Sequence, residues 1–392
     1  MFWIIISIID IILFCISAFA VCYILLYSIT SCWYQRMVPG ITKRYGRFLI
    51  ITTASAGDQG IEETIKSILN QQYDKKNFEL IVVGNGLTPL QKIKLAQHPI
   101  TLLCTNFENG TKGDAQRYAI ENMHSMKIYD NVIFINPDEI VSPDFLAEAN
   151  KVLQSGQHFF QMHRKPLATN NEASILSATM EEINNSIFRK GHVVLGMPSS
   201  LTDSALSLDY SWYKNNVKKI NKYDEDKSLE ALLLCQNIFV DYVDDVYVYV
   251  RPVETDTQII EQRKRWMKTK YSSLRQNLKL LFPSIIKWNR SIIDKIISWV
   301  MIPRIILMFI IILMSLLLPF IYFSLVIKWW ILFLIVTFAF ALATPDYIVQ
   351  DRRWARAFFH MPKILLKSTL SILIPKSIFE KFEKKFSRKS AS

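Results

Sequence analysis

The sequence predicts an α/β fold with a mostly parallel sheet, joined to transmembrane and interfacial helices. Two observations predict the sheet: short apolar runs alternate with helical patterns from residue 46 onwards, and polar residues follow three of these runs. A third observation, the presence of long apolar runs outside this region, predicts the membrane helices. With 392 residues, 51% of them hydrophobic, and a net charge of +12, the chain is long enough for one large domain and these helices.

The first apolar run covers residues 2–28, which is long enough to span a membrane because a helix needs roughly 20 residues to do so. A cleaved signal peptide is the alternative, but it needs a cationic start and a shorter apolar core, and the first cation here is Arg36. We therefore predict a retained helix at 1–28 and a basic juxtamembrane linker at 29–45. Asp10 inside the run is either a packed or protonated carboxyl or a functional group.

Two further spans, near 302–326 and 329–347, predict a transmembrane hairpin at 301–347. Cations flank all three spans on one side if the N-terminus is outside, and the positive-inside rule makes that side cytosolic. The prediction is a multi-pass protein of the inner or plasma membrane with its polar region in the cytosol. Interfacial amphipathic helices are predicted at 271–300 and a basic amphipathic tail at 348–392.

The excess positive charge suits an anionic membrane leaflet better than nucleic acid, since no nucleic-acid motif accompanies it. The five cysteines show neither metal nor disulfide spacing. We interpret them as free thiols that face a reducing compartment.

The polar region predicts strands at RFLIITTA, FELIVVGN, ITLLCTN and DNVIFIN, with helices such as IEETIKSILNQQY between them. Ligands in parallel α/β sheets bind at the carboxyl ends of the strands. Three such ends carry polar groups that suit a nucleotide: Gly57-Asp58, Asn85-Gly86 and the run from Asn136 to Glu139.

Four segments, in this order, resemble the membrane-bound family-2 glycosyltransferases, the group of the cellulose, chitin and hyaluronan synthases. NPDEIVSPDFL resembles the family's Asp-x-Asp strand end, and EEINNSIFRKGHVVLG resembles the segment before the acceptor region. DEDKSLEALLL resembles the motif that holds the catalytic base, and QRKRW matches Gln-x-x-Arg-Trp in full. The resemblance covers about 46–270 and implies a cytosolic GT-A domain there, which transfers a sugar from a nucleotide sugar with inversion.

The chain departs from the family pattern at four places. Gly57 stands where an acidic residue usually follows the first strand, and Asn85 stands where an aspartate follows the second. Asn136 replaces the first aspartate of Asp-x-Asp. The small Gly-Ser-Gly stretch near the acceptor is Asp203-Ser204-Ala205 here. The predicted donor pocket has therefore lost acidity at three points.

The leaving diphosphate must be neutralised, and a divalent cation held by carboxylate does this in the family. Asp138 is the candidate ligand for Mg²⁺ or Mn²⁺, with Glu139 as a helper or else an exposed strand-end acid. Asn136 should weaken metal binding. Lys112, before a predicted helix, is a candidate for contact with the nucleotide or else an exposed lysine. An Asn85 carbonyl can accept the N3–H bond of uracil, so UDP-linked donors are expected.

Asp226 is the candidate catalytic base, through the resemblance of its segment to the family's motif. The alternative is a solvated acid in the first turn of a helix, where acidic residues are favoured. In FFQMHRKP, Gln161, His163 and Arg164 lie in a family-like segment, and Arg164 either faces substrate or forms a structural pair.

The QRKRW motif supplies the predicted acceptor and diphosphate contacts. Trp266 offers a flat face for a sugar ring, and Arg265 can bind diphosphate oxygens in a bidentate way. Gln262 precedes Trp266 by about one helical turn, so both can face one cleft. The neighbouring lysines suit lipid headgroups instead, namely Lys264, Lys268 and Lys270.

Two functions remain open. The first is an inverting glycosyltransferase that builds a cell-surface polysaccharide or glycolipid from a nucleotide sugar, on a polysaccharide or lipid-linked acceptor. The second is a catalytically degenerate homologue that acts as a scaffold or partner subunit of an active synthase. Three spans are few for a sugar channel, so the protein either forms a homo-oligomer or synthase complex, or adds single sugars to a lipid carrier.

Overall fold

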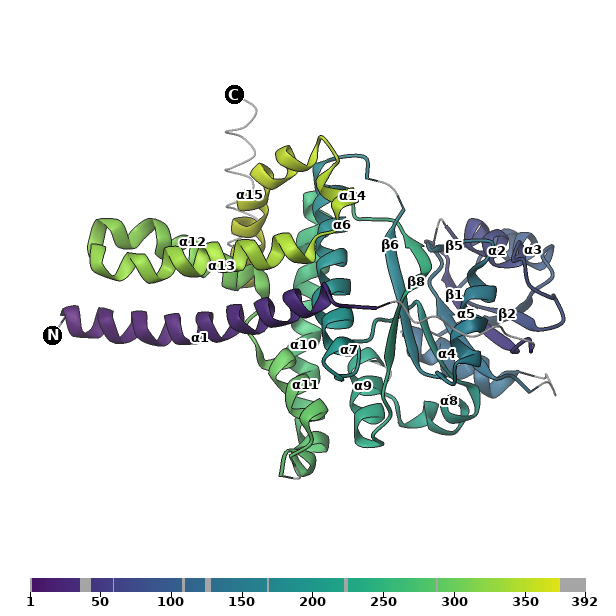
Figure 1. Cartoon of the computed structure of the whole chain (residues 1–392). Coiled ribbons are helices and arrows are strands. Elements are labelled where there is room, and N and C mark those ends of the chain that lie inside the picture. The colour runs from purple at the N-terminus through teal and green to yellow at the C-terminus, as the bar shows by residue number, and fades with distance from the viewer. Residues whose placement is uncertain are drawn as a thin grey trace.

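The computed structural model describes residues 2–35, 44–58, 60–107, 110–123, 128–167, 169–221, 225–286 and 288–373. Within these ranges, an eight-stranded sheet lies at one end of the molecule, and long apolar helices extend from the other end (Figure 1). The strands are β1 (Phe48–Ser55), β2 (Phe78–Asn85), β3 (Thr101–Thr105), β4 (Asn131–Ile135), β5 (Ile140–Val141), β6 (Phe160–Pro166), β7 (Leu206–Asp209) and β8 (Asp241–Val250).

The sheet is mixed, in the order β3-β2-β1-β4-β7-β6-β8-β5. The first four strands in this order pair in parallel, as the alternation of strands and helices predicts. β7 then pairs antiparallel with both β4 and β6, β8 runs parallel to β6, and the two-residue strand β5 pairs antiparallel with β8. The predicted α/β fold with a mostly parallel sheet is confirmed. The sequence analysis predicted β1 to β4 but not β5 to β8, nor the antiparallel pairing of β7.

Alternate residues of each central strand enter opposite cores, because side chains along a strand point to opposite faces. Phe48 and Ile50 of β1 pack with α2 and α5, whereas Leu49 and Ile51 pack with α4, α8 and α9. The helices around the sheet are α2 (Ile61–Leu69), α3 (Pro89–Ala96), α4 (Lys112–Asn122), α5 (Phe145–Gln154), α6 (Glu172–Asn184), α7 (His192–Val194), α8 (Tyr210–Asn216), η2 (Val217–Lys219) and α9 (Glu225–Cys235).

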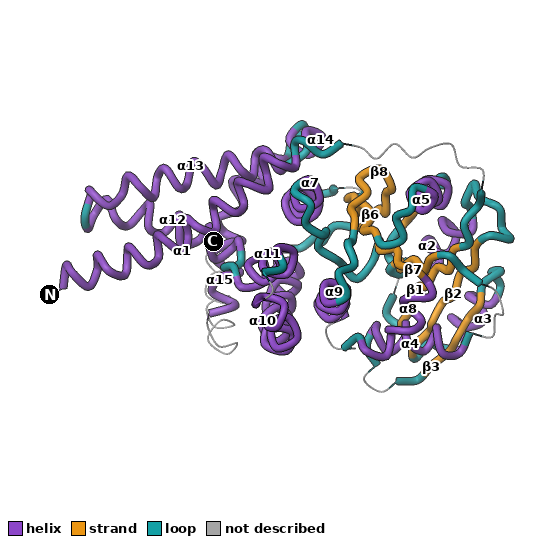
Figure 2. Tube along the Cα trace, turned by 60° about the horizontal axis from the view of Figure 1, so that its bottom comes forward, coloured by secondary structure: helices purple, strands orange, loops and turns teal. Residues whose placement is uncertain are grey.

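Three helices are long and apolar enough to cross a membrane, over Ser7–Ser31, Arg304–Ile321 and Phe323–Ala343. They lie side by side and point away from the sheet (Figures 1 and 2). The elements of this half are α1 (Phe2–Ser31), α10 (Asp256–Ile286), α11 (Arg290–Val300), α12 (Arg304–Ile321), η3 (Phe323–Leu325), α13 (Val326–Ala343), α14 (Asp346–Val349) and α15 (Trp354–Leu373).

The predicted domain limits stay predictions, but the limit at residue 270 and the predicted tail can be compared with the helices of the structure. The predicted boundary at 270 falls inside α10, which continues without a break from the QRKRW motif to Ile286. The tail contributes α15, which packs against α6, α10 and α12. Residues 36–43 of the predicted linker and 374–392 of the tail lie outside the described residues.

Asp10 is buried, with 1% of its surface exposed, where α1 meets the start of α13. Its carboxylate accepts a 2.8 Å hydrogen bond from the Trp329 indole and forms an ion pair with Lys328. A buried carboxylate is tolerated when it is paired and hydrogen-bonded in this way. The arrangement agrees with the interpretation of Asp10 as a packed carboxyl.

A π-helical turn, η1 (Asn185–Gly191), follows α6 and joins the sheet domain to the apolar helices. The Asn185 amide donates to the Arg164 carbonyl of β6, and the Ser186 hydroxyl donates to the Ala343 carbonyl at the end of α13. At its last residue, Gly191, the backbone of α1 comes so close that a Cβ atom would lie 2.2 Å from the Tyr27 carbonyl oxygen. A glycine is therefore required for α1 to dock here.

We expect Gly191→Ala to destabilise the protein by about 1–3 kcal/mol, because overpacking forces the backbone of α1 away from η1. Urea unfolding in detergent micelles, followed by tryptophan fluorescence, measures this loss. Gly57→Ala is the matched control, since no atom lies within 4 Å of its added Cβ. Equal unfolding midpoints for the two variants would refute the tight docking of α1.

Candidate active site

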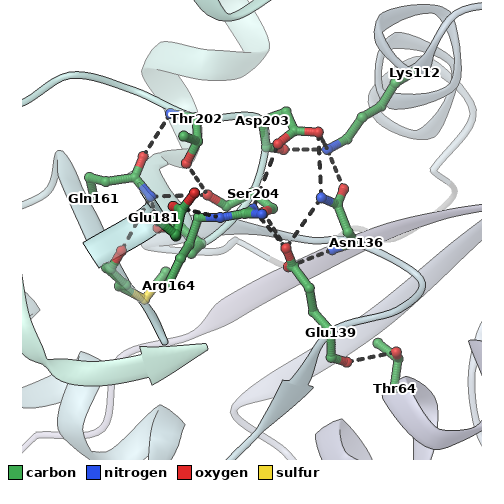
Figure 3. A network of polar contacts seen from close by, with 12 residues as sticks. Thr64, Lys112, Asn136, Glu139, Gln161, Arg164, Glu181, Thr202, Asp203 and Ser204 are labelled. Carbon is green, nitrogen blue, oxygen red and sulfur yellow. Dashed lines mark hydrogen bonds and ion pairs between the residues drawn. The ribbon is translucent and has the colours of Figure 1, made fainter. Parts of the chain in front are cut away.

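A network of polar side chains lies where β4 and β6 end (Figure 3). At its centre is Glu139, which is 1% exposed and forms a 2.7 Å ion pair with Arg164. The Ser204 hydroxyl donates a 2.5 Å bond to the same carboxylate, and the Asn136 backbone N–H donates another of 2.9 Å. Burial raises the pKa of Glu139, although the Arg164 guanidinium opposes this shift. Glu139 is therefore a buried acid that holds Asn136, Ser204 and Arg164 together at the strand end, and not an exposed acid.

Lys112 connects this network to the start of α4, where it is the first helical residue after the Thr111 capping box. Its ammonium group lies 2.6 Å from the Asn136 side-chain oxygen and 3.4 Å from the Asp203 carboxylate. It also donates to the Asp203 backbone carbonyl. Against the effect of burial, Lys112 holds the pKa of Asp203 at about 2. The candidate donor residues Lys112 and Asn136 are thus brought together, with Asp203 as an additional member.

We expect Asn136→Asp to destabilise the metal-free protein, because the amide nitrogen of Asn136 now donates to two carboxylates. It lies 3.2 Å from Glu139 and 3.4 Å from Asp203, and a carboxylate oxygen in its place would repel both. Thermal unfolding measures the loss, and Mn²⁺ should reverse it while binding more tightly than to the wild type. A variant with unchanged stability and unchanged Mn²⁺ affinity would exclude this position from the metal site.

Asp138, the candidate metal ligand, is exposed at the tip of the same strand end. Within the part of the chain that the structure describes, no group of three or more His, Cys, Asp or Glu side chains has metal-binding geometry. The nearby oxygens of Asn136 and Asp203 are hard ligands of the kind that Mg²⁺ and Mn²⁺ accept, with water and substrate phosphate completing the shell. In the structure the Asn136 oxygen and the Asp203 carboxylate contact the Lys112 ammonium, so the role of Asp138 as a metal ligand stays a prediction.

Asp226, the candidate base, lies in the first turn of α9 next to Glu225. Burial, and then the charges of Asp203 and Glu225, raise the pKa of Asp226 to about 8. Burial raises the pKa of Glu225 to about 7. Both acids act electrostatically on Lys112, so α9 faces the same network. A carboxylate with a pKa near neutrality is suited to accept a proton, which a solvated acid at a helix start is not.

Asn85, the candidate base-recognition residue, lies at the end of β2 and holds the following loop. Its side-chain oxygen accepts a 2.8 Å bond from the Phe107 N–H, and its amide donates to the Phe107 carbonyl at 3.4 Å. The Thr105 hydroxyl donates to the same oxygen at 3.4 Å, so a ligand N–H would have to replace one of these two donors. The uracil contact stays a prediction.

The QRKRW motif lies on α10, where Gln262 is partly buried and Arg265 is exposed. The side chain of Trp266 lies outside the described residues, as do those of Lys268 and Lys270. The arginine of this motif that turns inward is Arg263. Whether Gln262, Arg265 and Trp266 share a cleft with Asp226 stays a prediction.

The polar side chains of the segment FFQMHRKP form contacts within the fold. Gln161 binds three backbone groups of the loop before β7: it donates to the Ser204 and Ala205 carbonyls and accepts from the Thr202 N–H. His163 lies between two carboxylates, 2.7 Å from Asp244 and 2.9 Å from Glu182. Arg164 forms the structural pair that the sequence left open. Asp203 and Ser204 were missed as contributors, because their polar character was interpreted only as a departure from a small-residue stretch.

Comparison with known proteins gives one family and a common fold. The sequence model described as "Glycosyl transferase family group 2" matches residues 131–343, and no curated protein matches the chain. Among solved structures, the mannosyltransferase PcManGT from Pyrobaculum calidifontis, in complex with GDP-Man and Mn²⁺, is 13% identical with a TM-score of 0.54, over 94% of this chain and 99% of that one.

Two other solved structures are more distant. TarS from S. aureus is 13% identical with a TM-score of 0.42, over 82% of this chain and 90% of that one. Glucosyl-3-phosphoglycerate synthase from Mycobacterium tuberculosis is 16% identical with a TM-score of 0.40, over 61% of this chain and 86% of that one. The likeness to the mannosyltransferase carries the conclusion: the sheet domain has the expected GT-A-like α/β fold.

Proposed function

The chain belongs to glycosyl transferase family group 2, and we propose that this glycosyltransferase transfers a sugar from a nucleoside-diphosphate sugar to a lipid-linked or polysaccharide acceptor, with inversion, at the cytosolic face of a membrane. The observation that carries the proposal is the convergence of Lys112, Asn136, Asp203 and Asp226 at the carboxyl end of the sheet. This grouping supports the proposal, because a cation at the leaving diphosphate and a base at the acceptor hydroxyl both favour a single displacement at an anomeric carbon.

On the donor side, the chain supplies positive charge for the leaving diphosphate. Lys112 lies at the N-terminus of α4, where backbone N–H groups and the helix dipole also favour anions. Asp138, with the oxygens of Asn136 and Asp203 nearby, would hold a divalent cation, which neutralises developing charge on the diphosphate when bound. The neighbour PcManGT was solved with GDP-Man and Mn²⁺. A metal-dependent donor site, with uridine or guanosine diphosphate as leaving group, is therefore the expected chemistry.

On the acceptor side, Asp226 is proposed as the base that takes the hydroxyl proton. With a pKa of about 8, about a tenth of the Asp226 carboxyl groups are ionised at pH 7, and the ionised form has a high affinity for the proton. Glu225 and Asp203 support this property by their charge. Gln262, Arg265 and Trp266 are proposed to hold acceptor or diphosphate on the α10 side.

The membrane placement is supported by the three apolar helices. Their cation-rich flanks support a cytosolic location of the sheet domain, through the positive-inside rule. A site beside these helices would keep a lipid-linked or growing acceptor close to the bilayer.

The test is transfer by purified protein in detergent, with radiolabelled UDP- and GDP-sugars and lipid-phosphate acceptors, with and without Mn²⁺. Calorimetry with the same donors separates binding from turnover. Transfer from one donor confirms the proposal, and a requirement for Mn²⁺ confirms the metal site. Failure of every donor to bind, under both conditions, would overturn it in favour of a scaffold subunit, which the missing acids at Gly57, Asn85 and Asn136 would then explain.

A further inference from the structure

Two arginines at the membrane side of the sheet domain form no ion pair with any carboxylate in the part of the chain that the structure describes. Arg263 belongs to α10, and Arg304 is the first residue of α12. Both side chains are partly buried. The Nε atom of Arg263 is buried and has no hydrogen-bond partner, and no ion pair among the described residues includes either arginine. A guanidinium nitrogen that is buried without a partner is unfavourable, and a second cation beside it adds repulsion, so this place favours a bound anion.

The surroundings of the two arginines explain why the protein itself does not supply this anion. Arg304 donates to the Asn184 side chain and lies 5.2 Å from the centre of the Phe188 ring, both of which are neutral. The nearest acid, Glu181, is already shared between Arg164 at 3.4 Å and Arg189 at 3.2 Å. Burial, and then the positive charge of Arg304, lower the pKa of Arg263 to about 9, so the two cations lie close enough to repel.

The position of the pair indicates where the missing anion comes from. Arg304 opens a helix that is long and apolar enough to cross a membrane, and the start of this helix has no side-chain cap. Phosphate groups of lipids lie at the ends of such helices, and a helix N-terminus favours them further. The network of Glu181, Arg164 and Glu139 connects this point to the candidate active site.

We propose that Arg263 and Arg304 bind the phosphate group of a lipid-linked acceptor, so that an apolar chain lies along α12 while its phosphate enters between the two guanidinium groups. This inference rests on the proposed function, because it assumes that the acceptor is lipid-borne. Two guanidinium groups can bind phosphate oxygens through several charge-assisted hydrogen bonds. The leaving diphosphate also carries phosphate oxygens, so it is the other anion that could bind to these two arginines.

The experiment measures binding in detergent, with no donor present, of farnesyl phosphate, of farnesol and of inorganic pyrophosphate. Farnesyl phosphate is expected to bind, farnesol to bind much more weakly, and pyrophosphate not to compete. Arg263→Met and Arg304→Met should each weaken farnesyl phosphate binding roughly 10- to 100-fold. Arg263→Lys should retain most of the affinity. Arg290→Met, at an exposed position at the start of α11, is the matched control and should not change it.

Stability separates a binding role from a structural one. If the arginines await a ligand, Arg263→Met removes an unpaired charge, and the unliganded protein should melt at the same or a higher temperature than the wild type. Melting at a clearly lower temperature would assign Arg263 to the fold and overturn the inference. Pyrophosphate binding that displaces farnesyl phosphate would overturn the lipid source.

The outcome is independent of catalysis. A protein that binds farnesyl phosphate through both arginines but transfers no sugar would keep this inference and lose the proposed function. If the wild type transfers sugar but the Arg263→Met and Arg304→Met variants bind farnesyl phosphate as well as the wild type does, the proposed function is kept and this inference is lost.

Discussion

Asp226→Asn is expected to reduce the turnover of sugar transfer by about 10²- to 10⁴-fold, because general-base catalysis is worth about that much. An amide cannot accept the proton of the acceptor hydroxyl. Donor affinity should stay close to that of the wild type, since Lys112, Asn136 and Asp203 keep their contacts. Steady-state kinetics and donor calorimetry measure the two effects separately.

Glu225→Gln is the matched variant, because this acid is adjacent to Asp226 and also has a raised pKa. We expect a much smaller loss of turnover for it. If Glu225→Gln is the more damaging of the two, the base has been assigned to the wrong carboxylate.

The pH dependence of the wild type follows from the same acid. The pKa of Asp226 is raised to about 8, so the proton-accepting form increases up to that pH, and kcat/KM should rise with pH and level off above it. The raised pKa also means that the folded protein holds this proton between about pH 4 and 8 while the unfolded chain does not, so the contribution of Asp226 to stability falls over that range. Asp226→Asn should therefore remove both slopes and be at least as stable as the wild type at pH 8. A profile that falls from pH 6 to pH 8 would contradict the assignment.

Arg164→Met is expected to destabilise the protein by about 3–5 kcal/mol, the loss typical of breaking a buried ion pair by removing one partner. The variant leaves Glu139, which is 1% exposed, without its cation, and it removes a neighbour of Glu181. Urea unfolding measures the change. Arg44→Met is the control, because its 3.4 Å pair with Asp130 is at the surface, where such pairs contribute about 0–1 kcal/mol.

Two further measurements separate charge from shape in the Arg164 variant. Without Arg164 the pKa of Glu139 should rise further, so protonation at pH 5 should make the loss smaller than at pH 8. The double variant Arg164→Met/Glu139→Gln should recover part of the loss, since it removes both charges. A loss that is the same at both pH values and unchanged in the double variant would mean that packing, not charge, is the cause.

The parallel half of the sheet and the polar strand ends could be predicted from the sequence, because β1, β2 and β4 are continuous apolar runs followed by polar residues. β7 could not, since its alternation of apolar and polar residues, Leu-Ser-Leu-Asp, is only four residues long and the strand depends on pairing with β4 and β6. The role of Glu139 was also beyond a single sequence. Its burial depends on Arg164 and Ser204, which reach it from β6 and from the loop before β7.

The QRKRW motif shows the same limit for a functional side chain. Its sequence indicates a helix with aromatic and cationic groups, and α10 confirms the helix. The sequence cannot tell which arginine turns inward, because that depends on how α6, α9, α11 and α15 pack around α10. Arg263, which no motif position marks, is therefore visible only in three dimensions.

The pairing of Asp10 with Lys328 has a consequence for the way the protein is made. The two residues are 318 positions apart, so the first helix leaves the ribosome long before its cationic partner exists. In a bilayer, the Asp10 carboxyl of the first helix would have no ion-pair partner until Lys328 of the C-terminal hairpin has been made. We therefore expect the three apolar helices to pack together only after the last of them has been made, and chains truncated before Arg304 to be degraded faster than the full chain.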